Sequence, residues 1–194
     1  MLYLASKSPR RAELLQQIGV QFETLRIQLD ESILPGESAR SYVCRLAAAK
    51  ARSGASQLTP SDVVLGADTV VVRRDTILLK PKGREQAQDM LRSLSGQQHK
   101  VMSAVAMIAG QRHAESLSVS EVQFAELSAA EIDAYLALDE YRDKAGAYAI
   151  QGVAASFIKH LSGSYSGVMG LPLCEVSQLL RQFGVAFSVR PDAH

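Results

Sequence analysis

The pattern of apolar and polar positions divides the chain into two kinds of segment, one typical of strands and one typical of helices. Continuous apolar runs at residues 2–5 and 63–67, the second resuming at 70–72, are typical of strands buried in a sheet. The remaining segments that we interpret as strands are residues 20–29, 76–79, 99–108, 114–127 and 157–161. Apolar residues three and four apart indicate helices, which we predict after Ser8, after Ser38, over 84–94, after Ser128 and over 172–183.

Strands and helices alternate along the chain, which predicts an α/β fold with a mixed, strongly twisted sheet and helices on both sides. No repeat, low-complexity tract or linker separates the segments, so we predict one domain over residues 1–194. The tail over 190–194 is expected to be loose.

Composition and charge narrow the class of partner. The net charge of +1 argues against a nucleic-acid binder, and the chain lacks an aromatic stacking stripe. No apolar stretch is long enough to span a membrane and no export signal is evident, so we expect a cytoplasmic protein without a membrane partner. Cys44 and Cys174 lie far apart, which argues against a disulfide framework or a zinc site.

The first candidate site is the segment Ser6-Lys7-Ser8-Pro9-Arg10-Arg11 between a strand and a helix start. Ser8 before Pro9 is typical of a helix N-terminus, whose unpaired N–H groups favour phosphate. The hydroxyls of Ser6 and Ser8 and the guanidinium groups of Arg10 and Arg11 can add donors. An ordinary capped helix with solvated arginines is the alternative.

The second candidate is Asp68, followed by Thr69, within an apolar strand. Burying a carboxylate is costly unless it is paired, hydrogen-bonded or bound to metal. A catalytic or metal-binding role competes with an edge position or a buried ion pair with a lysine. Asp30 and Glu31 could complete an oxygen-rich Mg²⁺ or Mn²⁺ site. Lys50, Lys80 and Lys144 could converge on a phosphate.

A third segment, residues 143–152, surrounds Tyr148 and Gln151 with small residues, as expected close to a ligand or in a tight turn. The Gln151 amide could bind the donor and acceptor groups of a base. His99 we interpret as a structural histidine rather than a catalytic base.

These segments, in this order, resemble the Maf family of nucleoside triphosphate pyrophosphatases. The resemblance spans nearly the whole chain, and six segments carry it: residues 5–11, 66–70, 80–81, 95–101, 143–152 and 163–172. It implies an α/β fold, similar to that of inosine triphosphate pyrophosphatases, with two lobes around a deep cleft. A homodimer is also implied.

The resemblance also assigns roles by position. Asp68 matches the catalytic aspartate, and Arg10, Thr69 and Gln151 match positions associated with substrate choice. The other polar residues that line the family's cleft correspond in this chain to Ser6, Ser8, Arg11, Asp30, Lys50 and Lys80. The expected reaction is metal-dependent cleavage of a nucleoside triphosphate to the monophosphate and pyrophosphate.

Two segments favour one branch of the family. Residues 66–69 and 143–152 resemble the branch that prefers dTTP and UTP, with modified pyrimidine triphosphates as further substrates. The branch that acts on 7-methyl-GTP carries a tryptophan between the positions that correspond to Pro9 and Arg10. This chain has no residue inserted there. Three positions depart from the residues usual in the family. Ser103 stands in place of threonine, Tyr141 in place of proline, and Leu79 in place of glycine or glutamate. A non-catalytic nucleotide-binding regulator of septum formation and cell division is the alternative function.

Overall fold

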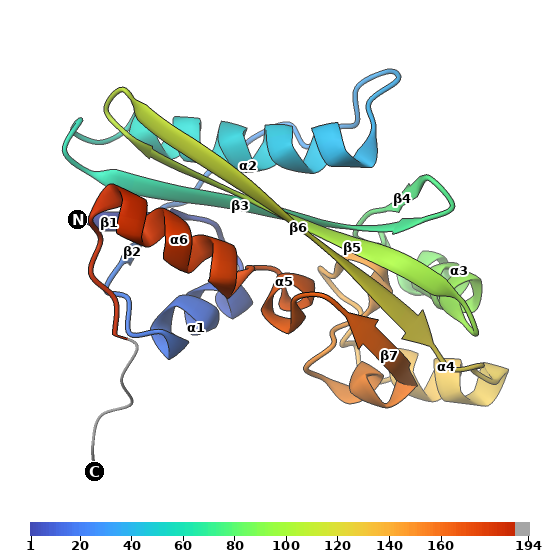
Figure 1. Cartoon of the computed structure of the whole chain (residues 1–194). Helices are drawn as coiled ribbons and strands as arrows, with labels where there is room; N and C mark the ends of the chain where they lie inside the picture. Colours follow the sequence, from blue (N-terminus) through green and yellow to red (C-terminus); the bar gives the residue numbers. More distant parts are fainter. Residues whose placement is uncertain (189–194) are drawn as a thin grey trace, which may run out of the picture.

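A computed structural model describes residues 1–188 of the chain, and a mixed sheet runs through this whole region (Figure 1). Its path is β2-β1-β3-β5-β6-β7, with β4 paired to β3 as a seventh strand within the described region. The strands are β1 (Leu2–Ala5), β2 (Glu23–Thr24), β3 (Val63–Arg73), β4 (Thr76–Leu78), β5 (Gln98–Ala109), β6 (Arg112–Phe124) and β7 (Ile158–Ser162). β1 is parallel to both neighbours, whereas β3 to β7 pair antiparallel.

Helices cover both faces of the sheet, as predicted for an α/β fold. The long helix α2 lies on one face, and α1, α5 and α6 lie on the other (Figure 1). The helices are α1 (Pro9–Gln17), α2 (Ala39–Ala55), α3 (Arg84–Leu94), α4 (Ala129–Leu136), η1 (Ala145–Ala147), η2 (Val153–Phe157), α5 (Tyr165–Met169) and α6 (Leu173–Phe183). No helix within residues 1–188 is long and apolar enough to cross a membrane. The predicted loose tail, 190–194, lies outside the described residues.

The predicted helix starts differ in how they are capped. The Ser38 hydroxyl accepts a hydrogen bond from the Ser41 N–H, and Ser128 with Glu131 forms the full capping box. Ser8 does occupy the N-cap position of α1, but its side chain makes no capping hydrogen bond. Its hydroxyl therefore remains available at the start of α1, beside the first candidate site.

The predicted strand over 20–29 is wrong in extent. Only Glu23–Thr24 forms a strand, paired with Tyr3 and Leu4 of β1. β1 is four residues long and ends at Ala5, so the rest of the segment finds no ladder partner. Since the segment lies at the sheet edge, its partly apolar sequence does not suffice to extend the strand.

Three clusters of buried apolar side chains form the core, and the long strands join them. Val71, Leu65 and Val70 of β3 belong to three different clusters, and β5 also contributes to each. One cluster lies under α2. The other two lie on the opposite face, one around α1 and α6 and one around α3 and α4 (Figure 1). We refer to these two regions as lobes.

A gap in the sheet lies at the centre of this arrangement. β1 pairs with residues 63–66 of β3, and β4 pairs with residues 71–73 along the same edge. Residues 67–70, which include Asp68 and Thr69, therefore have no ladder partner on that side. The chain leaves β1 at this point, so the Ser6–Arg11 turn lies beside the gap.

Candidate active site

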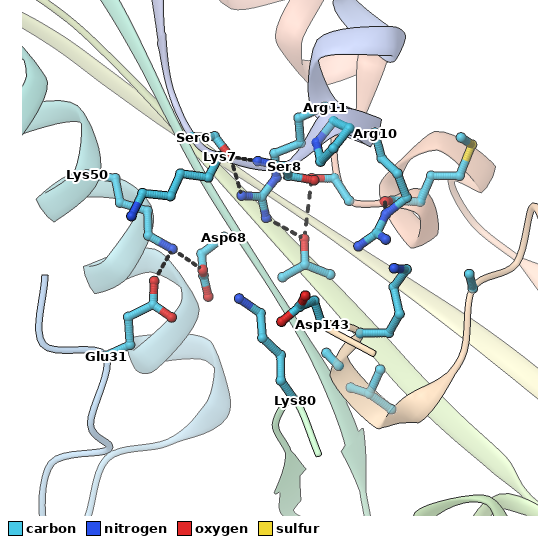
Figure 2. Close-up of a pocket in the computed structure, with 18 of the residues that line it drawn as sticks. Ser6, Lys7, Ser8, Arg10, Arg11, Glu31, Lys50, Asp68, Lys80 and Asp143 are labelled. Carbon is cyan, nitrogen blue, oxygen red and sulfur yellow. Dashed lines mark hydrogen bonds and ion pairs between the residues drawn. The ribbon is translucent and has the colours of Figure 1, made fainter. Parts of the chain in front are cut away.

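A cavity of about 860 Å³ occupies the gap and the space between the two lobes. Asp68 faces the α2 side of β3 and contacts Lys50 of α2 (Figure 2). Thr69, the next residue of the strand, contacts Arg11 on the opposite side. Alternate side chains of a strand normally line separate faces. The open edge lets both contribute to one cavity. The other walls are the turn after β1, the residues after β4, and the segment around η1.

Arg11 is fixed by neutral oxygen atoms on three sides. Its Nε donates to the Gly170 carbonyl at 2.8 Å, and its terminal nitrogens donate to Ser6 Oγ at 3.2 Å and Thr69 Oγ1 at 3.3 Å. Each terminal nitrogen retains a second hydrogen. The side chain is therefore preorganised and can still bind an anionic oxygen in the cavity.

Burial lowers the pKa of both arginines in this turn. For Arg10, burial comes first and the positive charge of Arg11 second, while for Arg11 burial is opposed by Asp68 and Glu31. Guanidinium groups nevertheless stay charged in proteins. Two adjacent, partly desolvated cations repel each other, so an anionic ligand between them would be stabilised.

Asp68 is 7% exposed and forms an ion pair with Lys50. The Lys50 Nζ lies 2.6 Å from Asp68 Oδ1 and 2.7 Å from Glu31 Oε1, so one ammonium bridges two carboxylates (Figure 2). Burial opposes ionisation of Glu31, but the hydrogen bond and charge of Lys50, with Lys80 and Arg11, lower the pKa of Glu31 overall. The structure thus shows both the buried ion pair with a lysine and, at the gap in the sheet, the edge position, and Asp68 also lines the cavity.

Gly66 explains how Lys50 reaches Asp68. A Cβ atom at residue 66 would overlap the backbone of Ala47 and Ala51 in α2. Only glycine allows the helix to approach the strand so closely. The Gly-Ala-Asp-Thr sequence therefore combines a packing requirement with the functional side chains that follow it.

Thr69 is tied to a buried hydroxyl network. Its Oγ1 lies 2.8 Å from Ser103 Oγ, and the Ser103 hydroxyl donates to the Gly167 carbonyl at 2.6 Å. Ser103 is 1% exposed. The hydroxyl, which threonine would also supply, is therefore the feature of residue 103 that this network uses.

The segment around η1 forms the wall opposite Arg10. Asp143, Lys144, Tyr148 and Gln151 all line the cavity. Burial lowers the pKa of Lys144, with a smaller contribution from the charge of Arg10. The third candidate segment thus faces the same space as the other two, and the Gln151 side chain is exposed to it.

The structure brings most of the predicted site residues to this one cavity. Those lining it are Ser6, Ser8, Arg10, Arg11, Glu31, Lys50, Asp68, Thr69, Lys80 and Gln151. Asp30 does not line it: the carboxylate is exposed and accepts the Ser32 N–H at 2.9 Å, which lowers its pKa. Within residues 1–188, no three His, Cys, Asp or Glu side chains are grouped to hold a metal ion. The predicted trio of Asp30, Glu31 and Asp68 is therefore not assembled.

Two charged residues that line the cavity were not predicted as ligands. Lys7 lay within the first candidate segment but was not singled out, although a lysine between two serines in a phosphate-type turn was a usable signal. Asp143 also lines the cavity, in a backbone conformation of φ 57°. The sequence carried no sign of that orientation, because it depends on the packing of η1.

Cationic side chains outnumber carboxylates in the cavity. Six are cationic (Lys7, Arg10, Arg11, Lys50, Lys80 and Lys144) and three are acidic (Glu31, Asp68 and Asp143). A cavity lined in this way concentrates positive potential and favours a small polyanion. The fold and the site together define an α/β protein with a cationic cavity beside a buried carboxylate, a site suited to a phosphorylated small molecule.

Comparison with known proteins gives the family. The model of the family described as Maf-like protein matches residues 1–183, and the chain belongs to this family. The dTTP/UTP pyrophosphatase of Pseudoalteromonas atlantica is 48% identical over 96% of this chain and 98% of its own length. That of Escherichia coli K12 is 48% identical over 100% and 98%.

Among solved structures, the Ham1 protein of Staphylococcus aureus is 12% identical, with a TM-score of 0.47 over 64% of this chain and 72% of that chain.

Proposed function

We propose that this protein is a nucleoside triphosphate pyrophosphatase that hydrolyses dTTP and UTP to the monophosphate and pyrophosphate. The observation that carries the proposal is the position of Asp68, a buried carboxylate in a cavity lined by six cations. Relatives of nearly equal length and about half identical sequence bear the name dTTP/UTP pyrophosphatase. Modified pyrimidine triphosphates belong to the proposed substrate class.

The donor set fits a divalent cation in part. Asp68 and Glu31 already share one cation, the Lys50 ammonium, and Mg²⁺ characteristically takes one or two carboxylates together with substrate phosphates. We therefore assign these two carboxylates, without Asp30, to Mg²⁺ or Mn²⁺. Such an ion would lower the pKa of a water molecule and offset phosphate charge.

The chain's own residues have distinct tasks in the proposed reaction. Asp68 accepts a proton from the water molecule that attacks the α-phosphorus, and the bond to the bridging oxygen breaks. Arg10, Arg11 and Lys80 stabilise the negative charge that moves to the leaving pyrophosphate. Lys50 holds the Asp68 side chain in place through their ion pair.

Base recognition falls to the far wall of the cavity. Gln151 carries an amide that can both donate to and accept from the edge of a pyrimidine. Thr69, fixed by Ser103, contacts Arg11 and lines the same cavity. Ser6 and Ser8 add hydroxyl groups at the start of α1, close to the phosphate-binding cations.

The test is pyrophosphate release from dTTP, UTP, CTP and 7-methyl-GTP, with and without Mg²⁺ or Mn²⁺. Asp68→Asn should bind dTTP in calorimetry but lose at least about a hundredfold in kcat, the usual share of a general base. Asp89→Asn, on the exposed surface of α3, is the matched control. Wild-type turnover by Asp68→Asn would refute the assignment of Asp68.

The same panel separates the alternative function. A non-catalytic regulator of cell division would bind the triphosphates tightly and release no pyrophosphate with any metal. In that case the cationic cavity would remain a ligand site, and Asp68→Asn would change only the affinity.

A further inference from the structure

We propose that His99 is a positioning residue of the active site, which holds the 143–151 segment in place through the hydroxyl group of Tyr148. His99 is the second residue of β5, is buried, and does not line the active-site cavity. Tyr148 does line it. The inference rests on the proposed function for its kinetic consequence, but the anchoring itself is a structural claim.

The 143–151 segment has little regular structure of its own. Its only helix is the three-residue η1, and Asp143 and Ala147 adopt positive φ angles of 57° and 63°. Such angles cost non-glycine residues roughly 1–2 kcal/mol each, so the surroundings must enforce them. The segment nevertheless supplies the lysine, aspartate and glutamine of one cavity wall.

The contact between Tyr148 and His99 supplies that enforcement. Tyr148 Oη lies 2.8 Å from His99 Nε2, and both residues are buried. Phe124 of β6 packs edge-on against both rings, with centroid distances of 5.1 Å to His99 and 4.9 Å to Tyr148. One side of the tyrosine thus forms cavity wall, while its hydroxyl reaches into the core.

His99 is a stiff support for this contact. Residue 99 is paired with Val122 of β6, and the adjacent Lys100 is paired with both β3 and β6, so the backbone at residue 99 is held by the ladder. The exposed fraction of His99 is 2%. Burial, with a smaller contribution from Arg73, lowers its pKa to about 4, so the imidazole is neutral at physiological pH and makes a neutral hydrogen bond.

The consequence reaches the substrate through Gln151, three residues after Tyr148. Loss of the anchor should displace Gln151 and Lys144, which lie on the segment. The position of Asp68, which lies on β3, should not change. We therefore expect an effect on KM and on the choice among bases, with kcat changed far less.

Hydrogen–deuterium exchange of Tyr148→Phe tests the anchor directly, since the ring stays and only the hydroxyl is lost. Amides in 143–151 should exchange at least about threefold faster, while those of β3 and β5 keep the wild-type rate. For dTTP, KM should rise about fivefold, the effect of one neutral hydrogen bond, and kcat should stay within about twofold.

Variants of His99 supply the matched controls. His99→Gln places an amide group close to the position of the imidazole Nε2. This variant should keep the slow amide exchange of the 143–151 segment and the low KM of the wild type. His99→Asn puts its amide at the place of Nδ1 and should behave as His99→Leu. The double variant His99→Leu/Tyr148→Phe should show no larger KM than either single variant, because both remove the same contact.

Unchanged exchange in the 143–151 segment of Tyr148→Phe would overturn the proposal, as would multiplied effects in the double variant. These outcomes are distinct from failure of the proposed function. If the wild-type protein released no pyrophosphate from any triphosphate, the exchange experiment would still decide whether His99 anchors the segment.

Discussion

Individual side chains of the cavity are held in place before any ligand arrives. Arg11 contacts a carbonyl and two hydroxyl groups, and Lys50 contacts two carboxylates. Such preorganisation removes the cost of reorienting charges during a reaction. The same reasoning applies to Thr69, whose hydroxyl is fixed by Ser103.

His99 should make stability depend on pH. Its pKa is lowered from 6.5 to about 4 in the folded protein by burial and then by Arg73. Since the unfolded chain binds the proton first, the contribution of His99 to stability is complete above pH 6.5 and declines as pH falls towards 4. The free energy of unfolding should fall by roughly 3 kcal/mol over this range from His99 alone.

Denaturant titration of the wild type and of His99→Gln between pH 7 and pH 4 measures the contribution of His99 to the free energy of unfolding. The difference between the two proteins isolates His99, because the carboxylates titrate in both. Parallel stability curves over the whole range would contradict a buried, neutral His99.

At the residue scale, the sequence was informative where an acidic residue stands within an apolar strand. A carboxylate within an apolar strand needs a partner, and Asp68 has both Lys50 and the cavity. Asp30 and Glu31 are adjacent, and the sequence could not separate them. Which of the two faces the cavity depends on the backbone path before α2, where Asp30 binds the Ser32 N–H instead.

At the scale of elements, the approach of α2 to β3 is the contact that assembles the carboxylate pair. Gly66→Ala would place a methyl group against the backbone of Ala47 and Ala51. Overpacking of this kind costs roughly 1–3 kcal/mol, and it should also move Lys50 from Asp68.

Thermal unfolding measures the loss of stability in Gly66→Ala, and the rate of dTTP hydrolysis measures the displacement of Lys50 from Asp68. Gly83→Ala is the control, because a Cβ at residue 83 meets no atom within 4 Å. It should cost less than about 1 kcal/mol and leave the rate unaltered. Equal losses in the two variants would contradict the close-contact argument.

Elements with both a periodic pattern and a terminating signal were predictable. Ser38 and Ser128 mark the starts of α2 and α4 as expected. The extent of β2 was not predictable, because it depends on the length of its partner β1. The short helix α5 was missed as well, since five residues carry too little periodicity to be recognised.

For the whole molecule, β3 and β5 contribute side chains to all three core clusters. We therefore expect the lobes to unfold together, consistent with the one-domain prediction. The chain has no tryptophan, so tyrosine fluorescence is the tertiary probe and far-ultraviolet circular dichroism the secondary one. Their denaturant transitions should coincide, and separated midpoints would indicate independently stable lobes.

The excess of cations in the cavity also bears on how a reaction cycle would end. Pyrophosphate is smaller than the nucleotide yet carries most of its charge, so six cationic side chains should retain it after the monophosphate has left. We expect pyrophosphate to compete with dTTP and to raise the melting temperature more than orthophosphate or thymidine monophosphate does. Added salt should weaken this effect, and departure of the inorganic product would then set the pace of turnover.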